Sequence, residues 1–303
     1  MLYKNISLCI GKTPLIELNN IKKEFNLKCN IYAKVEYFNP TGSVKDRIAL
    51  SMINDAEEKG LIKEGAVIIE PTSGNTGIGI ASICAIRGYR CILVMPESMS
   101  IERRKILSAY GAELVLTEAS KGMGGAIEKA KELNKEIENS IILGQFDNDA
   151  NVRIHYQTTG PEIVNDLGDL DYFVAGVGTG GTLTGSGKYI KENIKHAKVV
   201  AVEPESSPMI SKGEKGPHAI QGIGAGFIPK ILDKDLIDEV ITVNNDDAFE
   251  YAKLVGKKEG FLVGISAGAA LCAAIKIALR NENKNIVVIF PDSGDRYLST
   301  KLF

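Results

Sequence analysis

The 303-residue sequence contains no tryptophan, only three histidines and only five cysteines. The cysteines form no C-x-x-C pair and have no histidine cluster beside them, so we interpret them as buried, reduced thiols in preference to a metal or redox site. No apolar run reaches the roughly 18 residues that span a bilayer, and the N-terminal residues have no apolar signal core. These absences predict a cytoplasmic protein without membrane contact and without a resident metal.

The sequence also lacks an excess of either positive or negative charge. The 36 Lys and Arg residues nearly balance the 38 Asp and Glu residues, which gives a formal net charge of −2. Proteins dedicated to nucleic acids are usually basic, so we expect no nucleic-acid partner. Hydrophobic residues make up 44% of the sequence. That fraction is enough for a large core, and a chain of this length favours two lobes over one.

Short runs of β-branched residues alternate with amphipathic helical patterns. The predicted strands cover residues 66–70, 90–95, 113–116, 172–175, 199–202 and 285–290, and the clearest helices cover 46–59, 126–138, 246–259 and 267–280. Continuous apolar strands are typical of parallel sheets that are covered on both faces. The alternation therefore predicts an α/β fold of βαβ units, and a polar stretch rich in Asn and Asp at 144–151 suggests a boundary between two lobes.

A glycine-rich loop at 176–182, with the sequence GVGTGGT, lies between a predicted strand and a helical pattern at 183–190. Its glycines let the backbone approach a ligand closely, and its amides at a helix N-terminus suit a phosphate. Two alternatives remain open. Gly176, Gly178 and Gly181 also fit the G-x-G-x-x-G fingerprint of dinucleotide sites, with Glu203 at the position of the ribose-binding acid. The loop could instead serve only the packing of helix against strand.

A second loop, PTSGNTG at 71–77, follows another predicted strand and opens a helix near Ile78. Its hydroxyl and amide groups, together with the free amides of the helix start, suit a carboxylate ligand, because they offer donors and no competing acid. The alternative is simple N-capping, for which Ser, Thr and Asn are the preferred residues. We call residues 71–77 the asparagine loop.

Lys45 lies at the start of the helix predicted over 46–59. A cation there meets the positive end of the helix dipole. The same placement favours the neutral amine that a Schiff-base nucleophile requires. The alternative is an ordinary solvated lysine on the surface.

Taken together, the three loops resemble the β-family of pyridoxal-phosphate enzymes, which have the second fold type, and most closely the cysteine synthase (O-acetylserine sulfhydrylase) family. The likeness extends from GKTPL at 11–15 to SGDRYLS at 293–299, and it includes NPTGSVKDR, EPTSGNTG, TTGPEI, GVGTGGT and QGIGAGFIP. It implies two lobes, each a mostly parallel twisted sheet flanked by helices, with pyridoxal 5'-phosphate in the cleft between them. Residues 1–147 would form the N-terminal lobe, with Lys45 and the asparagine loop. Residues 148–303 would form the C-terminal lobe, with the glycine-rich loop at 176–182, which we call the phosphate loop. The first ~40 residues of this N-terminal lobe could instead pack on the C-terminal lobe.

The resemblance also implies a role for each matching residue. Lys45 would be the internal aldimine lysine and the proton-transfer base, and Asn75 would hydrogen-bond the pyridine hydroxyl. Ser266 would face the pyridine nitrogen, although it could instead cap the helix predicted at 267–280. The cofactor phosphate would be held by Gly178, Thr179, Gly180, Gly181 and Thr182. The substrate carboxylate would be bound by Thr72, Ser73, Thr76 and Gln145.

The activity implied by the resemblance is the synthesis of L-cysteine from O-acetyl-L-serine and sulfide, by β-replacement through an aminoacrylate intermediate. A cystathionine β-synthase-like reaction and a cysteine-desulfurising reaction that releases hydrogen sulfide are the alternatives, and a cofactor-binding regulatory partner is the non-enzyme alternative. The resemblance further implies a homodimer. It also suggests docking of the C-terminal tail of a serine acetyltransferase, although Ala219 stands where the family often has Lys.

Overall fold

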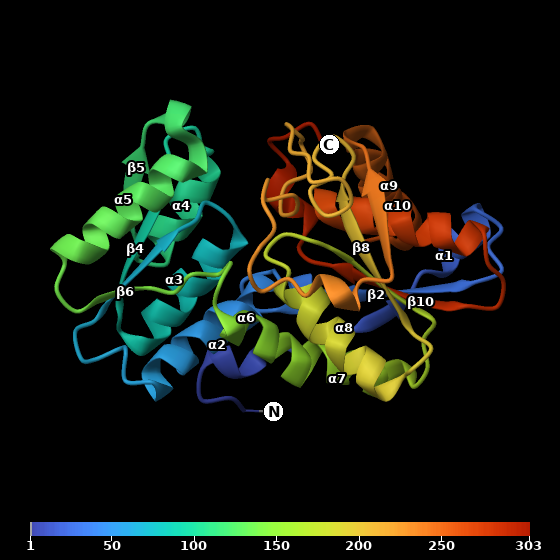
Figure 1. Cartoon of the computed structure of the whole chain (residues 1–303), viewed down its shortest axis with the longest axis horizontal. Coiled ribbons are helices and arrows are strands. Elements are labelled where there is room, and N and C mark those ends of the chain that lie inside the picture. The colour runs from blue at the N-terminus through green and yellow to red at the C-terminus, as the bar shows by residue number, and fades with distance from the viewer. Residues whose placement is uncertain (1) are drawn as a thin grey trace. The chain divides into compact units, whose positions relative to one another are not determined.

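Parallel strands form two separate sheets in the computed structural model, which describes residues 2–303 (Figure 1). The chain divides into two compact units that are discontinuous in sequence. Of the described residues, the first unit contains 2–10 and 45–151, and the second contains 11–44 and 152–303. Residues 11–44 therefore leave the first unit and fold with the C-terminal half of the chain.

The described residues form these helices and strands. The strands are β1 (Leu15–Glu17), β2 (Asn30–Val35), β3 (Val67–Pro71), β4 (Arg90–Pro96), β5 (Glu113–Thr117), β6 (Ser140–Ile142), β7 (Tyr172–Gly176), β8 (Lys198–Pro204), β9 (Glu239–Val243) and β10 (Asn285–Phe290). The α-helices are α1 (Asn19–Glu24), α2 (Lys45–Glu58), α3 (Asn75–Arg87), α4 (Ile101–Ala109), α5 (Gly122–Glu136), α6 (Asp149–Ile154), α7 (Gly160–Leu167), α8 (Gly181–Asn193), α9 (Asn245–Glu259) and α10 (Ile265–Leu279). A π-helix, η4 (His155–Thr159), joins α6 to α7, and short 3-10 helices lie at Ile6–Cys9, Glu36–Phe38, Ala119–Lys121, Lys234–Leu236 and Gly294–Tyr297.

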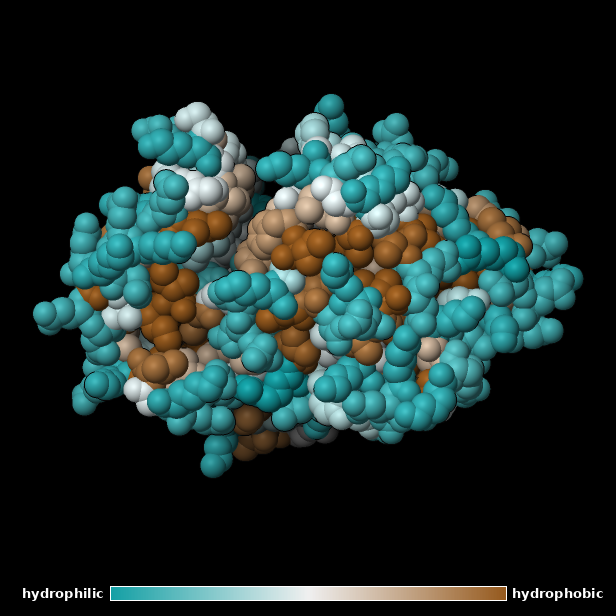
Figure 2. Space-filling view, in the orientation of Figure 1, coloured by the Kyte–Doolittle hydropathy of each residue, from teal (hydrophilic) through white to brown (hydrophobic). Residues whose placement is uncertain are grey.

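The first unit is built on a four-stranded parallel sheet in the order β5-β4-β3-β6. Alternate residues of β3 and β4 pack against Ala126 and Ala130 of α5 on one face, while α2 and α3 pack against one another and α3 also contacts β4. The two central strands have apolar residues on both faces, as expected for a parallel sheet between helices. Figure 2 shows mostly hydrophilic residues over α5, whose buried side is made of small residues.

The second unit is built on a six-stranded sheet in the order β1-β2-β10-β7-β8-β9. All of its neighbours are parallel except β1, which runs antiparallel to β2 at the edge. One face packs against α1, α9 and α10, and the other packs against α7 and α8. The carboxyl ends of the parallel strands share one edge in each sheet, and in folds of this kind ligands bind at that edge.

The predicted fold class is confirmed, since both sheets are mostly parallel and flanked by helices. Each predicted strand lies within one residue of an observed one at both ends, except that β8 ends two residues later than predicted, and the four clearest helices are present with ends shifted by up to four residues. Across residues 2–303, no helix combines the length and the apolar character needed to cross a membrane.

Candidate active site

The asparagine loop and Gln145 come together in the first unit. Thr76, in the first turn of α3, donates its hydroxyl to Gln145 Oε1 at 2.6 Å, although 69 residues separate the two in sequence. Thr72 accepts a hydrogen bond from the backbone N–H of Gly74 at 3.3 Å, which closes the turn before the helix. The side chains of Thr72, Thr76 and Gln145 are all buried. Four hydroxyl- or amide-bearing residues and Gln145 thus gather at the N-terminus of one helix.

N-capping does not explain this cluster. The N-cap of α3 is Gly74, and no side chain accepts a hydrogen bond from the first turn in the manner of a cap. Asn75 is already the first residue of the helix. The capping interpretation was therefore wrong for this loop.

Lys45 lies at the N-terminus of α2, in the same unit, and is half-buried. The helix α3 packs closely against this first turn: a Cβ atom on Gly79 would lie 3.1 Å from the carbonyl oxygen of Lys45 and 3.0 Å from Ala49 Cβ. Only glycine allows this approach without a shift of the backbone, and it brings the starts of α2 and α3 together. The interpretation of Lys45 as an ordinary solvated surface residue does not fit this burial.

Two charged residues beside the asparagine loop were not expected from the sequence. Arg103 of α4 donates Nη1–H to the carbonyl oxygen of Ser73 at 3.1 Å. Glu70, which precedes the loop by one residue, is 1% exposed and accepts hydrogen bonds from the backbone N–H groups of Gly144 at 3.0 Å and Gln145 at 3.2 Å. Burial raises the pKa of the Glu70 carboxyl to about 7, in spite of these hydrogen bonds.

The predicted phosphate loop lies in the second unit, at the carboxyl end of β7. Its N-cap residue Gly180 has a left-handed backbone, and α8 begins at Gly181, so the first amides of the helix, which have no carbonyl partner within the helix, fall within the loop. A Cβ atom on Gly178 would lie 2.3 Å from the carbonyl oxygen of Gly222. The loop thus packs directly against the backbone of the 222–226 segment. Amides at a helix N-terminus, lined by glycine, form a cradle that fits a phosphate group.

Glu203 argues against the dinucleotide alternative. This buried carboxylate lies near the end of β8 and accepts hydrogen bonds from Ile210 N at 2.7 Å, Ser211 N at 3.1 Å and Ser211 Oγ at 2.5 Å. Both of its oxygens are therefore engaged by the loop that follows its own strand. A ribose-binding acid needs a carboxylate that faces the ligand, so the fingerprint match at 176–181 does not mark a dinucleotide site.

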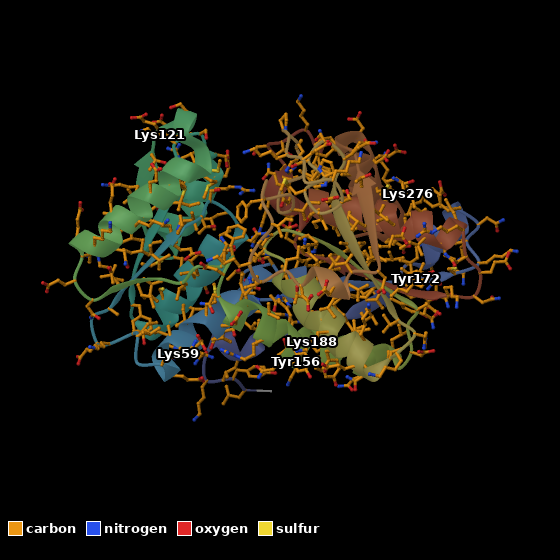
Figure 3. All side chains as sticks on the ribbon, in the orientation of Figure 1. Lys59, Lys121, Tyr156, Tyr172, Lys188 and Lys276 are labelled. Atoms are coloured by element: carbon orange, nitrogen blue, oxygen red, sulfur yellow. The ribbon has the colours of Figure 1, made fainter. Side chains whose placement is uncertain are left out.

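His155 contacts the phosphate loop, and its sequence context predicted no role for it. It is buried at the start of the π-helix, with Nδ1 2.9 Å from Thr159 Oγ1 and Nε2 3.1 Å from Thr182 Oγ1. In the same π-helix, the ring centre of Tyr156 lies 5.8 Å from the ammonium of Lys188 in α8 (Figure 3). The π-helix thereby orients the hydroxyl of Thr182, a predicted phosphate ligand.

Ser266 lies beside the same group of loops. It is 3% exposed and occupies the second position of α10, whose N-cap is Gly264. A Cβ atom on Gly222 would lie 3.6 Å from Ser266 Oγ, so the serine, the 222–226 segment and the phosphate loop are neighbours. The alternative that Ser266 caps this helix was wrong, because the helix begins one residue before it.

Comparison with known proteins identifies the family of this chain. The sequence profile of the family described as "Pyridoxal-phosphate dependent enzyme" matches residues 6–292. A cysteine synthase of Staphylococcus aureus is 52% identical over 302 residues, which cover 99% of this chain and 96% of the relative.

Solved structures give the same result. A cysteine synthase from Entamoeba histolytica has a TM-score of 0.97 at 45% identity, with 100% of this chain and 91% of that chain covered. A hydrogen sulfide-producing enzyme from Fusobacterium nucleatum has a TM-score of 0.94 at 46% identity, with 98% and 100% covered. The glycine-lined cradle of the second unit fits the phosphate group of the family's cofactor. The chain therefore belongs to the family of pyridoxal-phosphate-dependent enzymes, and pyridoxal 5'-phosphate is its cofactor.

Proposed function

We propose that this chain is a cysteine synthase, which joins sulfide to the β-carbon of O-acetyl-L-serine and releases acetate. The observation that supports the proposal most directly is the cluster of uncharged donors around the start of α3, where Thr76 hydrogen-bonds Gln145. Such donors at a helix N-terminus suit the carboxylate of an amino-acid substrate. The identity to the cysteine synthase of S. aureus over nearly the whole chain supports the same reaction.

Lys45 is the residue to which we assign both covalent attachment of the cofactor and proton transfer. When bound, pyridoxal phosphate acts as an electron sink that makes the α-proton of the attached amino acid acidic. The positive end of α2 favours the neutral form of the Lys45 amine. A neutral amine can take the α-proton from the substrate and return it to the product after sulfide has added.

We assign the remaining contacts with cofactor and substrate to residues of both units. In the first unit, Asn75 would hydrogen-bond the pyridine hydroxyl, and the substrate carboxylate would be bound by Thr72, Ser73, Thr76 and Gln145. In the second unit, residues 178–182 would hold the phosphate and Ser266 would face the pyridine nitrogen. A serine hydroxyl leaves that nitrogen nearly neutral, whereas a carboxylate would keep it protonated. A weaker electron sink favours rapid loss of the β-substituent over transamination.

The leaving group is argued from the segment 222–226, which packs beside the phosphate loop. It offers only Gly, Ile and Ala side chains. The nearby His218 has its Nε2 2.9 Å from the carbonyl oxygen of Gly224, so this ring nitrogen is engaged by the backbone of the segment. Acetate needs no general acid to leave, whereas hydroxide needs one and phosphate needs a cation to offset its charge. We therefore expect O-acetylserine to be used far better than serine or O-phosphoserine.

The test is a comparison of kcat/KM for O-acetylserine, O-phosphoserine and serine, each with sulfide, using the purified holoenzyme and cysteine formation as the readout. The proposal requires the highest value for O-acetylserine. A value for O-phosphoserine equal to or above it would contradict the assignment of the leaving group. Absence of cysteine formation from all three would contradict the function.

Sulfide release from cysteine is a second candidate, which the likeness to the hydrogen sulfide-producing enzyme of F. nucleatum favours. Hydrosulfide, like acetate, leaves without a strong general acid, so the same segment tolerates it. The two candidates are separated by measuring sulfide from cysteine alone and cysteine from O-acetylserine plus sulfide with one enzyme preparation. The larger kcat/KM identifies the main reaction.

We also propose that the enzyme is a cytoplasmic homodimer that binds the C-terminal tail of a serine acetyltransferase. All five cysteines are free thiols, which is typical of a reducing compartment. A peptide that ends in a free carboxylate matches the donors of the asparagine loop. Light scattering tests the dimer, and calorimetry with such tail peptides tests the partner. A monomeric mass or the absence of any heat of binding would remove the respective proposal and leave the enzyme assignment intact.

A further inference from the structure

Glu70 is a buried acidic residue near the end of an apolar strand. It is the fourth residue of β3, whose preceding residues Val67, Ile68 and Ile69 are all buried, and its own side chain is 1% exposed. Carboxylates are rarely buried to this degree, because the charged form loses its hydration. A leucine or a methionine would fill the same space at a lower cost in free energy. The carboxylate must therefore do something that an apolar side chain cannot do.

Its two oxygens bind the turn that follows the neighbouring strand. The strands β3 and β6 pair in parallel up to Ile69 and Ile142. Immediately beyond that point, Gly144 N donates to one oxygen of Glu70 at 3.0 Å and Gln145 N donates to the other at 3.2 Å. One side chain thus collects the consecutive N–H groups of the turn.

Two asparagines hold the carbonyl groups of the same turn. Asn148 Nδ2 donates to the carbonyl oxygen of Leu143 at 2.8 Å, and Asn151 Nδ2 donates to that of Gln145 at 2.8 Å. The backbone on either side of Gln145 is therefore bound through both its N–H and its carbonyl groups. Glu70 accepts the hydrogen bonds from the N–H groups, and the two asparagines donate to the carbonyl groups. These contacts all lie within the first unit.

The side chain at the centre of the turn is Gln145. Its Oε1 accepts from the hydroxyl of Thr76 at 2.6 Å, which leaves the two N–H groups of the same amide as the donors that a ligand would meet. Their direction depends on where the backbone of the turn is held. Because hydrogen bonds weaken steeply when distance and angle depart from ideal values, a shift of the turn weakens a contact to a bound carboxylate.

We propose that Glu70 is a positioning residue for substrate binding, which fixes the 143–145 turn so that the Gln145 amide meets the α-carboxylate of the amino-acid substrate. The inference rests on the proposed function for the role of Gln145. Glu70 itself does not touch the substrate. It stands one residue before the asparagine loop on the chain and also holds the turn that carries Gln145, so it links the two groups of carboxylate donors.

The test is Glu70→Gln, which keeps the shape of the side chain but offers one acceptor oxygen where the carboxylate offers two. We expect the KM for O-acetylserine to rise roughly tenfold or more, because a hydrogen bond to a charged group is weakened. We expect kcat to change by less than about threefold, because the residues that move protons are untouched. The control is Asp171→Asn in the second unit, where a carboxylate likewise accepts a backbone N–H, that of Asn285 at 2.9 Å. Asp171 lies at the amino ends of the strands, and its variant should keep the wild-type KM.

A double-mutant cycle decides whether Glu70 acts through Gln145. If it does, Glu70→Gln adds little to the KM of Gln145→Ala, whereas independent effects would multiply. Multiplicative effects, or an unchanged KM in Glu70→Gln, would overturn the inference. Should Glu70→Gln fold poorly, Glu70→Asp withdraws the carboxylate by one methylene and must show the same rise in KM. The proposed function is tested separately, by turnover of the wild-type enzyme. The inference about Glu70 is tested by the KM of each variant divided by the wild-type KM for the amino acid that the wild type uses.

Discussion

The sharpest steric prediction concerns Gly178 of the phosphate loop. An alanine at this position would place its Cβ 2.3 Å from the carbonyl oxygen of Gly222. Ordinary contact between such atoms needs about 3.4 Å, so the backbone on one side has to move by roughly 1 Å. The Cβ is attached rigidly to one backbone and the oxygen belongs to another, so no flexible side chain can give way. A displacement of this size lengthens hydrogen bonds from the loop amides to a phosphate.

The expected result for Gly178→Ala is a fall in cofactor affinity of about tenfold to a hundredfold, because one hydrogen bond to a charged group contributes about 1.5–3 kcal/mol. Overpacking should also lower the free energy of unfolding by about 1–3 kcal/mol. Cofactor affinity is measured by titration of the apoenzyme with pyridoxal phosphate, and stability by urea unfolding without cofactor.

Gly124→Ala is the matched control, since a Cβ atom there has no neighbour within 4 Å and the residue lies inside α5. Relief of the helix penalty of glycine should stabilise this variant by about 0.5–1 kcal/mol without any change in cofactor affinity. Unchanged cofactor affinity in Gly178→Ala would refute the assignment of the loop as a tightly packed phosphate cradle.

Three further outcomes are expected. Lys45→Ala should abolish cysteine formation, and turnover at a near wild-type rate would exclude Lys45 as the attachment residue. Ser266→Asp should slow acetate loss from O-acetylserine in stopped-flow experiments, because a carboxylate would keep the ring nitrogen protonated; an unchanged rate would exclude contact with the ring. Burial raises the pKa of Glu70 from 4.5 to about 7. The folded chain therefore retains a proton that the unfolded chain loses near pH 4.5, and the free energy of unfolding should fall by about 3 kcal/mol as pH rises from 4.5 to 7. Urea unfolding at several pH values should show this fall in the wild type and not in Glu70→Gln.

The strands that could be predicted are those whose burial leaves a continuous apolar run, such as β3, β4 and β10. The strand β2 was missed because Lys34 interrupts its apolar pattern. In the structure Lys34 is fully buried, donates to the carbonyl oxygen of Thr13 at 2.6 Å and lies 3.0 Å from Glu162 Oε2. A charge in a strand is stabilised here by groups far away in the sequence, and such compensation leaves no local signal.

The residues of the candidate site likewise divide into those that the sequence could predict and those that it could not. The asparagine loop and the phosphate loop could be predicted because their residue types are concentrated within seven positions of sequence. Gln145 was placed with the asparagine loop only through the resemblance to a family. His155 and Arg103 were not predicted at all, because their contacts, with Thr182 and with Ser73 respectively, join residues that are far apart in the sequence. No periodicity or spacing encodes a single contact between distant residues.

The two carboxylates Glu70 and Glu203 show how one structural device can imitate a functional pattern. Each is followed by a proline at the end of a parallel strand, each is buried, and each accepts backbone N–H groups from a loop later in the chain. An acid at the end of a strand can hold the loops at the ligand-binding edge of a sheet, where free amides would otherwise lack acceptors. Glu203 happened to lie at the spacing of a ribose-binding acid and so supported a dinucleotide interpretation. Glu70 lay in an apolar run and was counted only as the end of a strand. For both residues, the position in the sequence is the same whether the acid binds a ligand or holds a loop. Only the hydrogen-bond partners of the carboxylate in the structure distinguish these two roles.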